Sequence, residues 1–337
     1  MELTTQQNKV FEQIKAFLYS DASVFILRGY AGTGKTTMVK VIADYIKQSR
    51  QLVMMAPTGR AARVLNKKTG HDAVTIHKAI YGKAHVQPIK VKDVADSEFK
   101  FVFPICQSEY GGNIVAIVDE ASMLCSRKIE HELFVFGTDN VMEDLLTYVR
   151  PNFGGKVIFV GDPAQLPPVG EPVSNALRAE YFQEQGLKVI EAELTEVLRQ
   201  KGDSVILKNA MMIRDLLKKD KRNQLVFEEQ KDDVEMVPSE QFLDKYLKYR
   251  KESGRHDSVI ICFSNKSANR YNKDIRKALY GGDVPLREND ILLITQNNYR
   301  LGIMNGEFVP VLSVGARTQQ SAPIYAQIVG KKQRIVI

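Results

Sequence analysis

Short apolar runs alternate with segments of helical periodicity over the first half of the chain. The runs have the length and composition of strands buried on both faces, and they cover residues 24–27, 52–56, 113–118 and 156–160. Between them, apolar residues recur at helical spacing. The helices predicted from this spacing cover residues 4–19, 38–46, 60–66 and 139–149. Strands that alternate with helices predict an α/β fold with a parallel, doubly wound sheet.

The pattern changes around residues 191–199, where a second α/β domain is predicted to begin. Apolar spacing predicts a helix at 205–217, another buried strand at 258–263 and a helix at 268–279. From residue 290 the chain is β-like, with strands predicted at 291–295, 308–314 and 324–329 and a hairpin turn at Asn305-Gly306. We therefore expect a first domain over 1–193, part of a second over 194–289, and a β-rich region over 290–337. An irregular segment at 83–112, with an alternating run at 99–103, is expected to form an inserted hairpin or small subdomain.

The turn after the first apolar run matches the phosphate-binding pattern G-x-x-x-x-G-K-[ST] at every position, and a helix follows it. Glycines let the backbone curl so that its N–H groups point at an anion, and the helix N-terminus adds positive charge. Lys35 is expected to reach the β- and γ-phosphates of ATP, and Thr36 to offer a hydroxyl to Mg²⁺. The residues predicted to hold the nucleotide are Gly29, Ala31, Gly32, Thr33, Gly34, Lys35, Thr36 and Thr37.

Two carboxylates follow the third apolar run, at Asp119 and Glu120. In ATPases with a phosphate-binding loop, an acid at a strand tip holds Mg²⁺, and we assign Asp119 to that role. A neighbouring carboxylate can polarise the attacking water, which makes Glu120 the candidate base. The alternative is a pair of solvated surface acids, which the preceding apolar strand disfavours.

Two further polar residues are candidates for the same catalytic site. Gln165 follows the fourth apolar run and could sense the γ-phosphate or its attacking water through its amide. Arg199, at the start of the second domain, is placed to act as an arginine finger across a closing cleft. For Arg199, an ordinary surface role is an equally good interpretation of the position alone.

The chain is basic, and its basic residues are concentrated in one segment. The net charge is +7, and residues 57–92 contain eight Lys or Arg against one acid, Asp72. A charge run is usually a solvated face, but hydroxyls, cations and a helix N-terminus in this segment are also good phosphate ligands. The candidate contacts to the phosphates of a nucleic acid are Pro57, Thr58, Arg60, Arg63, Thr75, His77 and Lys78. Phe101 could stack on a base or act as a wedge, although core packing explains alternating Phe residues as well.

Other classes of protein fit the sequence less well. Cys106, Cys125 and Cys262 are far apart, so there is neither a zinc motif nor a disulfide framework, and each is expected to be a small core residue. The N-terminus is polar and no apolar run approaches the ~20 residues of a membrane span, so we expect a cytoplasmic protein.

Six motifs in order resemble those of superfamily 1B DNA helicases of the RecD-like and Dda-like kind. Motifs I, Ia, Ib, II, III and IV correspond to residues 29–37, 56–65, 75–82, 118–123, 161–170 and 194–200. Residues 3–7 resemble the family's N-terminal Q motif, which would make Gln7 the adenine reader. The resemblance implies two RecA-like motor domains, a strand-separating pin at 83–112 and the start of an SH3-like insertion at 290–314.

The resemblance also implies an activity: ATP- and Mg²⁺-dependent 5′→3′ movement on single-stranded DNA, with unwinding at junctions between single and double strands. A monomeric, nucleoid-associated motor is expected. Leu198 replaces the aromatic residue that the UvrD-like branch has before its motif IV arginine, which favours the RecD-like branch. Motifs V and VI are not found before Ile337, and from this we infer a truncated helicase. Two alternatives stay open: a RecD-like ATPase subunit of an exonuclease or repair complex, and an ATP- and DNA-binding fragment with little turnover.

Overall fold

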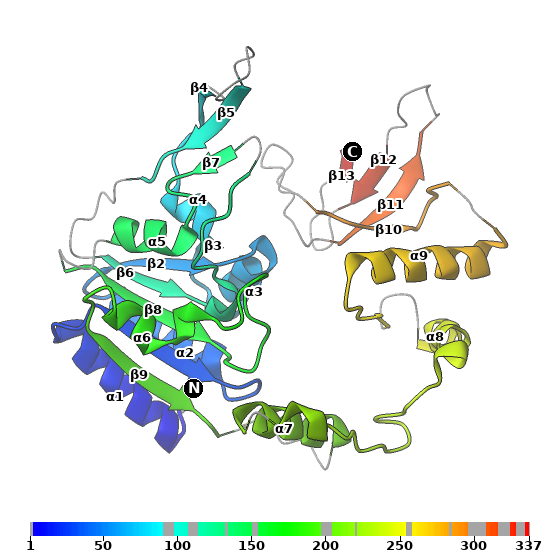
Figure 1. The fold of residues 1–337 in the computed structure, drawn as a ribbon, viewed down its shortest axis with the longest axis horizontal. Helices are drawn as coiled ribbons and strands as arrows, with labels where there is room; N and C mark the ends of the chain where they lie inside the picture. The colour runs from blue at the N-terminus through cyan, green and yellow to red at the C-terminus, as the bar shows by residue number, and fades with distance from the viewer. Residues whose placement is uncertain are drawn as a thin grey trace. The chain divides into compact units, whose positions relative to one another are not determined.

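The computed structural model shows two compact units, Met1–Gln200 with Ile294–Gly306, and Lys201–Leu293 with Glu307–Ile337 (Figure 1). Within the chain, the residues that the structure describes are 3–89, 98–106, 114–131, 134–149, 154–196, 204–219, 221–253, 258–282, 285–295, 308–315, 324–327 and 334–336.

The first unit is built on a six-stranded parallel sheet with the strand order β3-β2-β6-β8-β1-β9. Its strands are β1 (Val24–Gly29), β2 (Gln51–Ala56), β3 (Ala73–Thr75), β6 (Ile114–Val118), β8 (Lys156–Gly161) and β9 (Val189–Leu194). The predicted α/β class with a parallel sheet is confirmed, and the four predicted strands are its four inner strands. Because all six strands are parallel, their carboxyl ends meet at one edge of the sheet.

Helices cover both faces of this sheet. One layer contains α1 (Thr5–Tyr19), α2 (Lys35–Ile46) and α3 (Gly59–Thr69), and the other contains α4 (Ile76–Ile80), α5 (Val141–Val149) and α6 (Ala179–Gln183). Successive strand residues point to opposite faces. Val24 and Ile26 of β1 therefore pack with α4, α5 and α6, whereas Phe25 and Leu27 pack with α1, α2 and α3. This double burial explains why the inner strands carry runs of consecutive apolar residues, such as residues 24–27.

A small three-stranded sheet lies within the same unit. It contains β4 (His85–Ile89), β5 (Glu98–Phe103) and β7 (Phe134–Phe136). β4 and β5 pair antiparallel, and β7 joins β5 in parallel from a segment that the sequence pattern did not predict as a strand. Rings hold the two together, because Phe103 stacks on Phe136 with their centroids 4.6 Å apart.

The described part of the second unit contains three helices and an antiparallel sheet. The helices are α7 (Val205–Lys218), α8 (Ser239–Ser253) and α9 (Asn265–Tyr280). The strands are β10 (Ile291–Leu293), β11 (Phe308–Val314), β12 (Ile324–Gln327) and β13 (Arg334–Val336), paired in that order. Three short 3-10 turns complete the described elements of the chain: η2 (Ala121–Met123), η4 (Asn175–Leu177) and η5 (Arg222–Gln224).

The strand predicted at 258–263 is wrong. These residues pair with no described strand, and Val259 and Phe263 are 78% and 104% exposed. A strand needs a neighbour to satisfy its backbone N–H and C=O groups, which an apolar pattern alone cannot provide. The prediction of core cysteines is also only partly correct: Cys125 is buried, but Cys106 and Cys262 are half-buried.

Over the described ranges, every helix lacks the combination of length and apolar content needed to cross a membrane.

Candidate functional site

The turn between β1 and α2 has the backbone of a phosphate-binding loop. Gly32 and Gly34 both have φ near +84°, a conformation that glycine adopts without steric cost. Gly34 is the N-cap of α2 and offers no side-chain cap, so the helix N-terminus is open to an anion. At Gly29 a Cβ atom would lie 2.8 Å from Thr33 Oγ1, which explains the need for glycine at this close approach.

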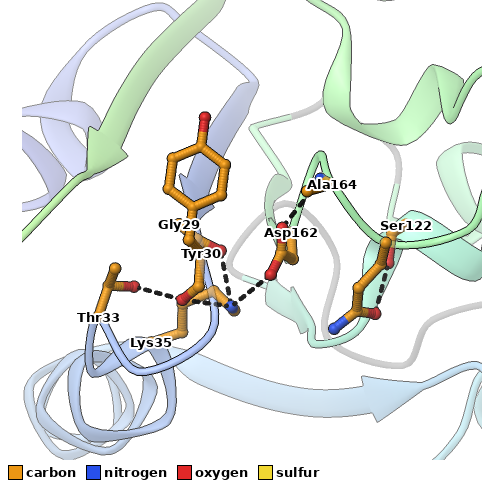
Figure 2. Close-up of polar contacts among 8 residues, drawn as sticks. Gly29, Tyr30, Thr33, Lys35, Ser122, Asp162 and Ala164 are labelled. Carbon is orange, nitrogen blue, oxygen red and sulfur yellow. Dashed lines mark hydrogen bonds and ion pairs between the residues drawn. The ribbon is translucent and has the colours of Figure 1, made fainter. Parts of the chain in front are cut away.

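Lys35 is held above this turn by backbone carbonyls (Figure 2). Its Nζ donates to Gly29 O at 2.6 Å and to Tyr30 O at 3.1 Å, and it lies 3.8 Å from Asp162 Oδ2. Thr33 Oγ1 donates to Tyr30 O at 2.8 Å and fixes the loop from within. An ammonium group restrained at the mouth of the loop is placed to meet the oxygens of an incoming phosphate.

The remaining residues of the loop differ in their exposure. Ala31 is exposed, and Gly32, Thr36 and Thr37 are half-buried. Thr36 and Thr37 belong to the first turn of α2, directly after Gly34. They are therefore near the anion-attracting end of the helix, as the sequence motif predicts.

Gln7 supports the phosphate-binding loop from α1. It is buried, its Nε2 donates to Thr33 O at 3.3 Å, and its Oε1 accepts from Thr4 N at 3.1 Å. Thr4 and Gln7 together form a capping box at the start of α1. This contact ties the N-terminus to the loop, and a contact between Gln7 and adenine stays a prediction.

Asp119 and Glu120 follow β6 at the carboxyl edge of the sheet. Glu120 has φ +52°, and this left-handed turn redirects the chain after a strand whose side chains alternate between faces. Glu120 Oε2 is buried and has no hydrogen-bond partner among the residues that the structure describes. A buried carboxylate oxygen without a partner is costly, and such atoms in native sites often mark where a ligand or water binds.

The electrostatics of the pair separate the two acids from ordinary surface carboxylates. Asp119 is buried, and desolvation, followed by repulsion from the charge of Glu120, raises its pKa to about 6. Such a raised pKa indicates that the site is built to receive a positive charge.

The loop after β8 brings a third group of side chains to the same edge. Asp162 is buried, and its Oδ1 accepts from Ala164 N at 2.9 Å while its Oδ2 faces Lys35. Gln165 is exposed, and its Oε1 accepts from Ser122 Oγ at 3.3 Å (Figure 2). Asp162 was not a predicted site residue, although its position directly after a buried strand, like that of Asp119, is a signal that could have identified it.

The donor set suits a magnesium ion held together with phosphates. The described residues contain no group of three or more His, Cys, Asp and Glu side chains that could hold a metal by themselves. Mg²⁺ in phosphate-transfer sites is usually held by one or two protein oxygens, with phosphate oxygens and waters completing its shell. Thr36 and Asp119 offer such a pair, and the buried, unpartnered oxygen of Glu120 is next to it in sequence.

Arg199, the predicted arginine finger, lies outside the described residues, so that prediction is untested.

The predicted phosphate contacts of the basic segment also follow strands of the sheet. Pro57 and Thr58 come directly after β2, and Thr58 caps α3 by accepting from Ala61 N at 3.2 Å. Thr75 ends β3 and caps α4 by accepting from Lys78 N at 3.2 Å. Both hydroxyls are therefore used in capping, and their role is to orient the helix starts that carry the cations.

The cations of this segment are on or near the surface. Arg60 and Lys78 are exposed, and Arg63 is half-buried, with its pKa lowered by that burial. His77 also has an exposed side. Phe101 on β5 is 44% exposed, with its ring centroid 5.9 Å from that of Phe134. An exposed Phe on a small sheet agrees with either predicted role, a stacking surface or half-buried packing.

One carboxylate that the sequence did not single out connects the loop after β8 to the chain that follows η2. Glu171 accepts from Ser126 N at 2.7 Å, Ser126 Oγ at 2.9 Å and Cys125 Sγ at 2.8 Å. Burial and this bond raise the pKa of the Cys125 thiol, which keeps it protonated and donating. Arg127 adds bonds to Gly170 O and Val169 O. The loop that carries Gln165 is therefore bonded to the chain that follows η2.

A family model described as AAA domain matches residues 2–238, more than two thirds of the chain. Among curated proteins, the chain is similar to the ATP-dependent RecD2 DNA helicase of Deinococcus radiodurans, with 29% identity over 62% of this chain and 23% of that protein. It is also similar to the ATP-dependent DNA helicase dda of phage T4, with 24% identity over 91% of this chain and 64% of that protein. The chain thus spans about a quarter of the length of the RecD2 helicase and about two thirds of the length of the dda helicase.

Solved structures show the same fold. All of this chain aligns with 74% of Bacteroides Pif1 bound to single-stranded DNA, with a TM-score of 0.52 and 20% sequence identity. All of this chain also aligns with 76% of a Pif1 chain from a study of unwinding at forked double-stranded DNA, with a TM-score of 0.54 and 20% sequence identity. The similarity to the RecD2 and dda helicases supports the predicted resemblance to superfamily 1B helicases. Because the family model covers residues 2–238, the chain belongs to the AAA domain family.

Proposed function

We propose that this chain is the motor of an ATP-dependent DNA helicase, which couples ATP hydrolysis to 5′→3′ movement on single-stranded DNA and to unwinding at junctions. The observation that carries the proposal is the buried, unpartnered Oε2 of Glu120 beside Asp119. Both follow one strand of the sheet, while Lys35 follows another at the same edge. These groups are the ones that phosphoryl transfer to water requires.

Each side chain has a defined task in this proposal. Lys35 leaves the carbonyls of Gly29 and Tyr30 for the β- and γ-phosphates, and Asp162 holds the ammonium group in place during the exchange. Thr36 and Asp119 hold Mg²⁺, which neutralises charge on the phosphate oxygens when it is bound. Glu120 orients the attacking water and accepts its proton.

The motor also needs to sense the γ-phosphate and to grip DNA. Gln165 is proposed as the sensor, and Arg199 as the finger that completes the site when the motor domains close. Arg60, Arg63 and Lys78 are proposed to contact the phosphates of single-stranded DNA. One of the similar Pif1 structures is bound to single-stranded DNA and another concerns unwinding at forked double-stranded DNA, which supports this partner. Three further parts of the proposal rest on the family resemblance: the 5′→3′ direction of movement, association with the nucleoid in the cytoplasm, and a monomeric state.

The test is ATP hydrolysis measured with and without single-stranded oligothymidylate. We expect the oligonucleotide to raise the rate, because DNA binding should be coupled to turnover. The Glu120→Gln variant should keep nucleotide affinity but lose on the order of 10²-fold or more in kcat, since the general base is removed.

Glu180→Gln is the matched control, because Glu180 is an exposed carboxylate on α6 that pairs with Arg178. An unchanged kcat in the Glu120→Gln variant would show that Glu120 is not the base. Nucleotide and DNA binding without any turnover in the unmodified chain would instead favour a binding module over a motor.

A further inference from the structure

Two adjacent glutamines lie in the first turn of α1, and their side chains bond to different parts of the first unit. Gln7 is buried, and its Nε2 donates to Thr33 O inside the phosphate-binding loop at 3.3 Å. Gln6 is half-buried and bonds to the chain that leaves β9. The start of α1 therefore connects the phosphate-binding loop to the carboxyl end of β9, beside which it lies (Figure 1).

Gln6 makes three hydrogen bonds with the two residues that follow β9. Its Nε2 donates to Thr195 Oγ1 at 2.9 Å, and its Oε1 accepts from Thr195 N and Glu196 N, both at 3.1 Å. Gln6 and Thr195 are 189 positions apart in sequence, so no local turn produces these bonds. One amide thus uses both of its ends to hold two backbone N–H groups beyond the end of the strand.

The same end of β9 also packs against the phosphate-binding loop. Leu194, the last residue of β9, pairs in register with Gly29, the first residue of the loop. A Cβ atom on Gly29 would lie 3.2 Å from Leu194 Cβ, so the two backbones approach closely. Leu194 is completely buried, whereas Thr195 and Glu196 are exposed. Packing therefore ends at Leu194, and Gln6 fixes the direction in which the chain continues.

The strength of this contact suits a segment that has to move. Water competes for exposed hydrogen bonds, so each contributes only a modest net free energy. Three bonds on one amide favour one path of the chain over others, yet they can break without disturbing the core. Segments that move during function are drawn from such weakly held parts of a protein.

The direction of the chain after β9 matters because Arg199, the proposed arginine finger, is three residues beyond Glu196. Three residues of extended chain span at most about 10 Å. A fixed Glu196 therefore restricts the positions that the guanidinium group of Arg199 can reach. Such restriction before the site closes reduces the entropy that is lost when the finger enters it.

We propose that Gln6 is a positioning residue for ATP hydrolysis, which holds residues 195 and 196 beside the phosphate-binding loop and so orients Arg199 for closure. The inference rests on the proposed function, because it takes Arg199 as the finger. Gln7 ties the same turn of α1 to the loop, so a shift of the loop on nucleotide binding is passed to Gln6 as well. The role is separate from the expected contact between Gln7 and adenine.

The first test is a double-mutant cycle on the rate of ATP hydrolysis by the full chain. Gln6→Ala should lower kcat roughly tenfold with little change in KM, because the lost bonds act on the finger and not on the bound nucleotide. In an Arg199→Ala background the same substitution should cost nothing further, because the group that Gln6 positions is already absent. Gln6→Glu keeps an acceptor for both N–H groups, and Thr195 Oγ1 can donate to it, so this variant should retain most of kcat.

Gln13→Ala is the matched control, because Gln13 is an exposed glutamine of the same helix. It should leave kcat and KM unchanged. The positioning role would be overturned by an unchanged kcat in Gln6→Ala, by an equal loss with and without Arg199, or by a Gln6→Glu variant as slow as Gln6→Ala.

Amide hydrogen exchange, followed by NMR at each residue, tests the contact without turnover. The Thr195 and Glu196 amides should exchange roughly tenfold faster in Gln6→Ala than in the unmodified chain, because each loses its acceptor. Gln13→Ala should not change their exchange. Equal rates in the two variants would show that Gln6 does not hold this segment. Full hydrolysis by the Arg199→Ala variant would overturn the finger of the proposed function, whereas the exchange rates report the Gln6 contact by itself, which separates the two failures.

Discussion

At the scale of single residues, the site combines two acids with different surroundings. Asp119 is buried, and its carboxylate is desolvated and repelled by Glu120, so its ionised form is disfavoured when no cation is bound. Glu120 has an oxygen without a described partner. Both features cost stability in the free protein, and functional sites commonly carry such costs because the ligand relieves them.

The cost at Asp119 predicts a pH-dependent stability. Its pKa in the folded chain is about 6 against an ordinary value of 3.8, so stability is lost as the pH rises from about 4 through 6. The Asp119→Asn variant removes this penalty. In the presence of a chelator, we expect it to be more stable than the unmodified chain at pH 8, by on the order of 1–3 kcal/mol, and the difference to disappear near pH 4.

Denaturant unfolding at several pH values measures this difference. Asp72→Asn is the control, because Asp72 is exposed and its substitution should not change the pH profile. A pH-independent difference would show that the Asp119 carboxylate is not penalised in the free protein.

At the scale of elements, the loop after β8 links the proposed nucleotide site to a pocket of about 150 Å³, which is lined in part by Pro57 and His77, two of the predicted DNA contacts. It begins at Asp162, which faces Lys35, and ends at Glu171, which accepts three hydrogen bonds from Cys125 and Ser126. Met123 and Arg127, close to these partners in sequence, line the pocket. A change at the phosphate end of this loop thus has a bonded route to the pocket.

Removal of that link should separate turnover from DNA binding. The Glu171→Ala variant leaves the Ser126 donors without their acceptor, which costs about 1–3 kcal/mol of stability. We expect basal ATP hydrolysis to remain and its stimulation by single-stranded DNA to fall several-fold. Glu180→Ala, at an exposed position, should change neither quantity. Full stimulation in the Glu171→Ala variant would show that coupling does not pass through this carboxylate.

At the scale of the whole molecule, charge is distributed unevenly. The net charge is +7, and residues 57–92 carry eight of the cations with a single acid. In the described part of this segment, Arg60 and Lys78 are exposed next to the carboxyl edge of the sheet. By contrast, Lys188 lies just before β9, at the amino edge, and pairs with Asp21. The first unit therefore presents proposed DNA contacts at the carboxyl edge.

This distribution predicts a steep salt dependence of DNA affinity. The logarithm of the affinity should fall with the logarithm of the salt concentration by about 0.7 for each single-strand phosphate that is neutralised. Lys78→Ala should reduce that slope by about 0.7, because one phosphate contact is lost. Lys188→Ala is the control and should leave it unchanged. An identical slope in both variants would remove Lys78 from the DNA interface.

Local patterns predicted much of the first unit. The β1–α2 turn and the four inner strands were identified because their signals are contained in a few consecutive residues, such as glycines at fixed spacing or a wholly apolar run. The outer strands β3 and β9 were missed. Val189–Leu194 includes two glutamates, and it becomes a strand because β1 offers it a partner along its whole length. Membership of a sheet depends on such neighbours, which are distant in sequence.

The sequence by itself determined the phosphate-binding loop, the parallel α/β core and the family, because glycine conformation, burial periodicity and ordered motifs are local properties. Only the tertiary structure decided that Asp162 faces Lys35, that Glu120 has an unpartnered oxygen, and that Phe136 from one segment meets His77 from another to make a pocket. It also decided that residues 258–263 form no strand. Each of these depends on which distant residues are brought together, and no short stretch of sequence specifies that.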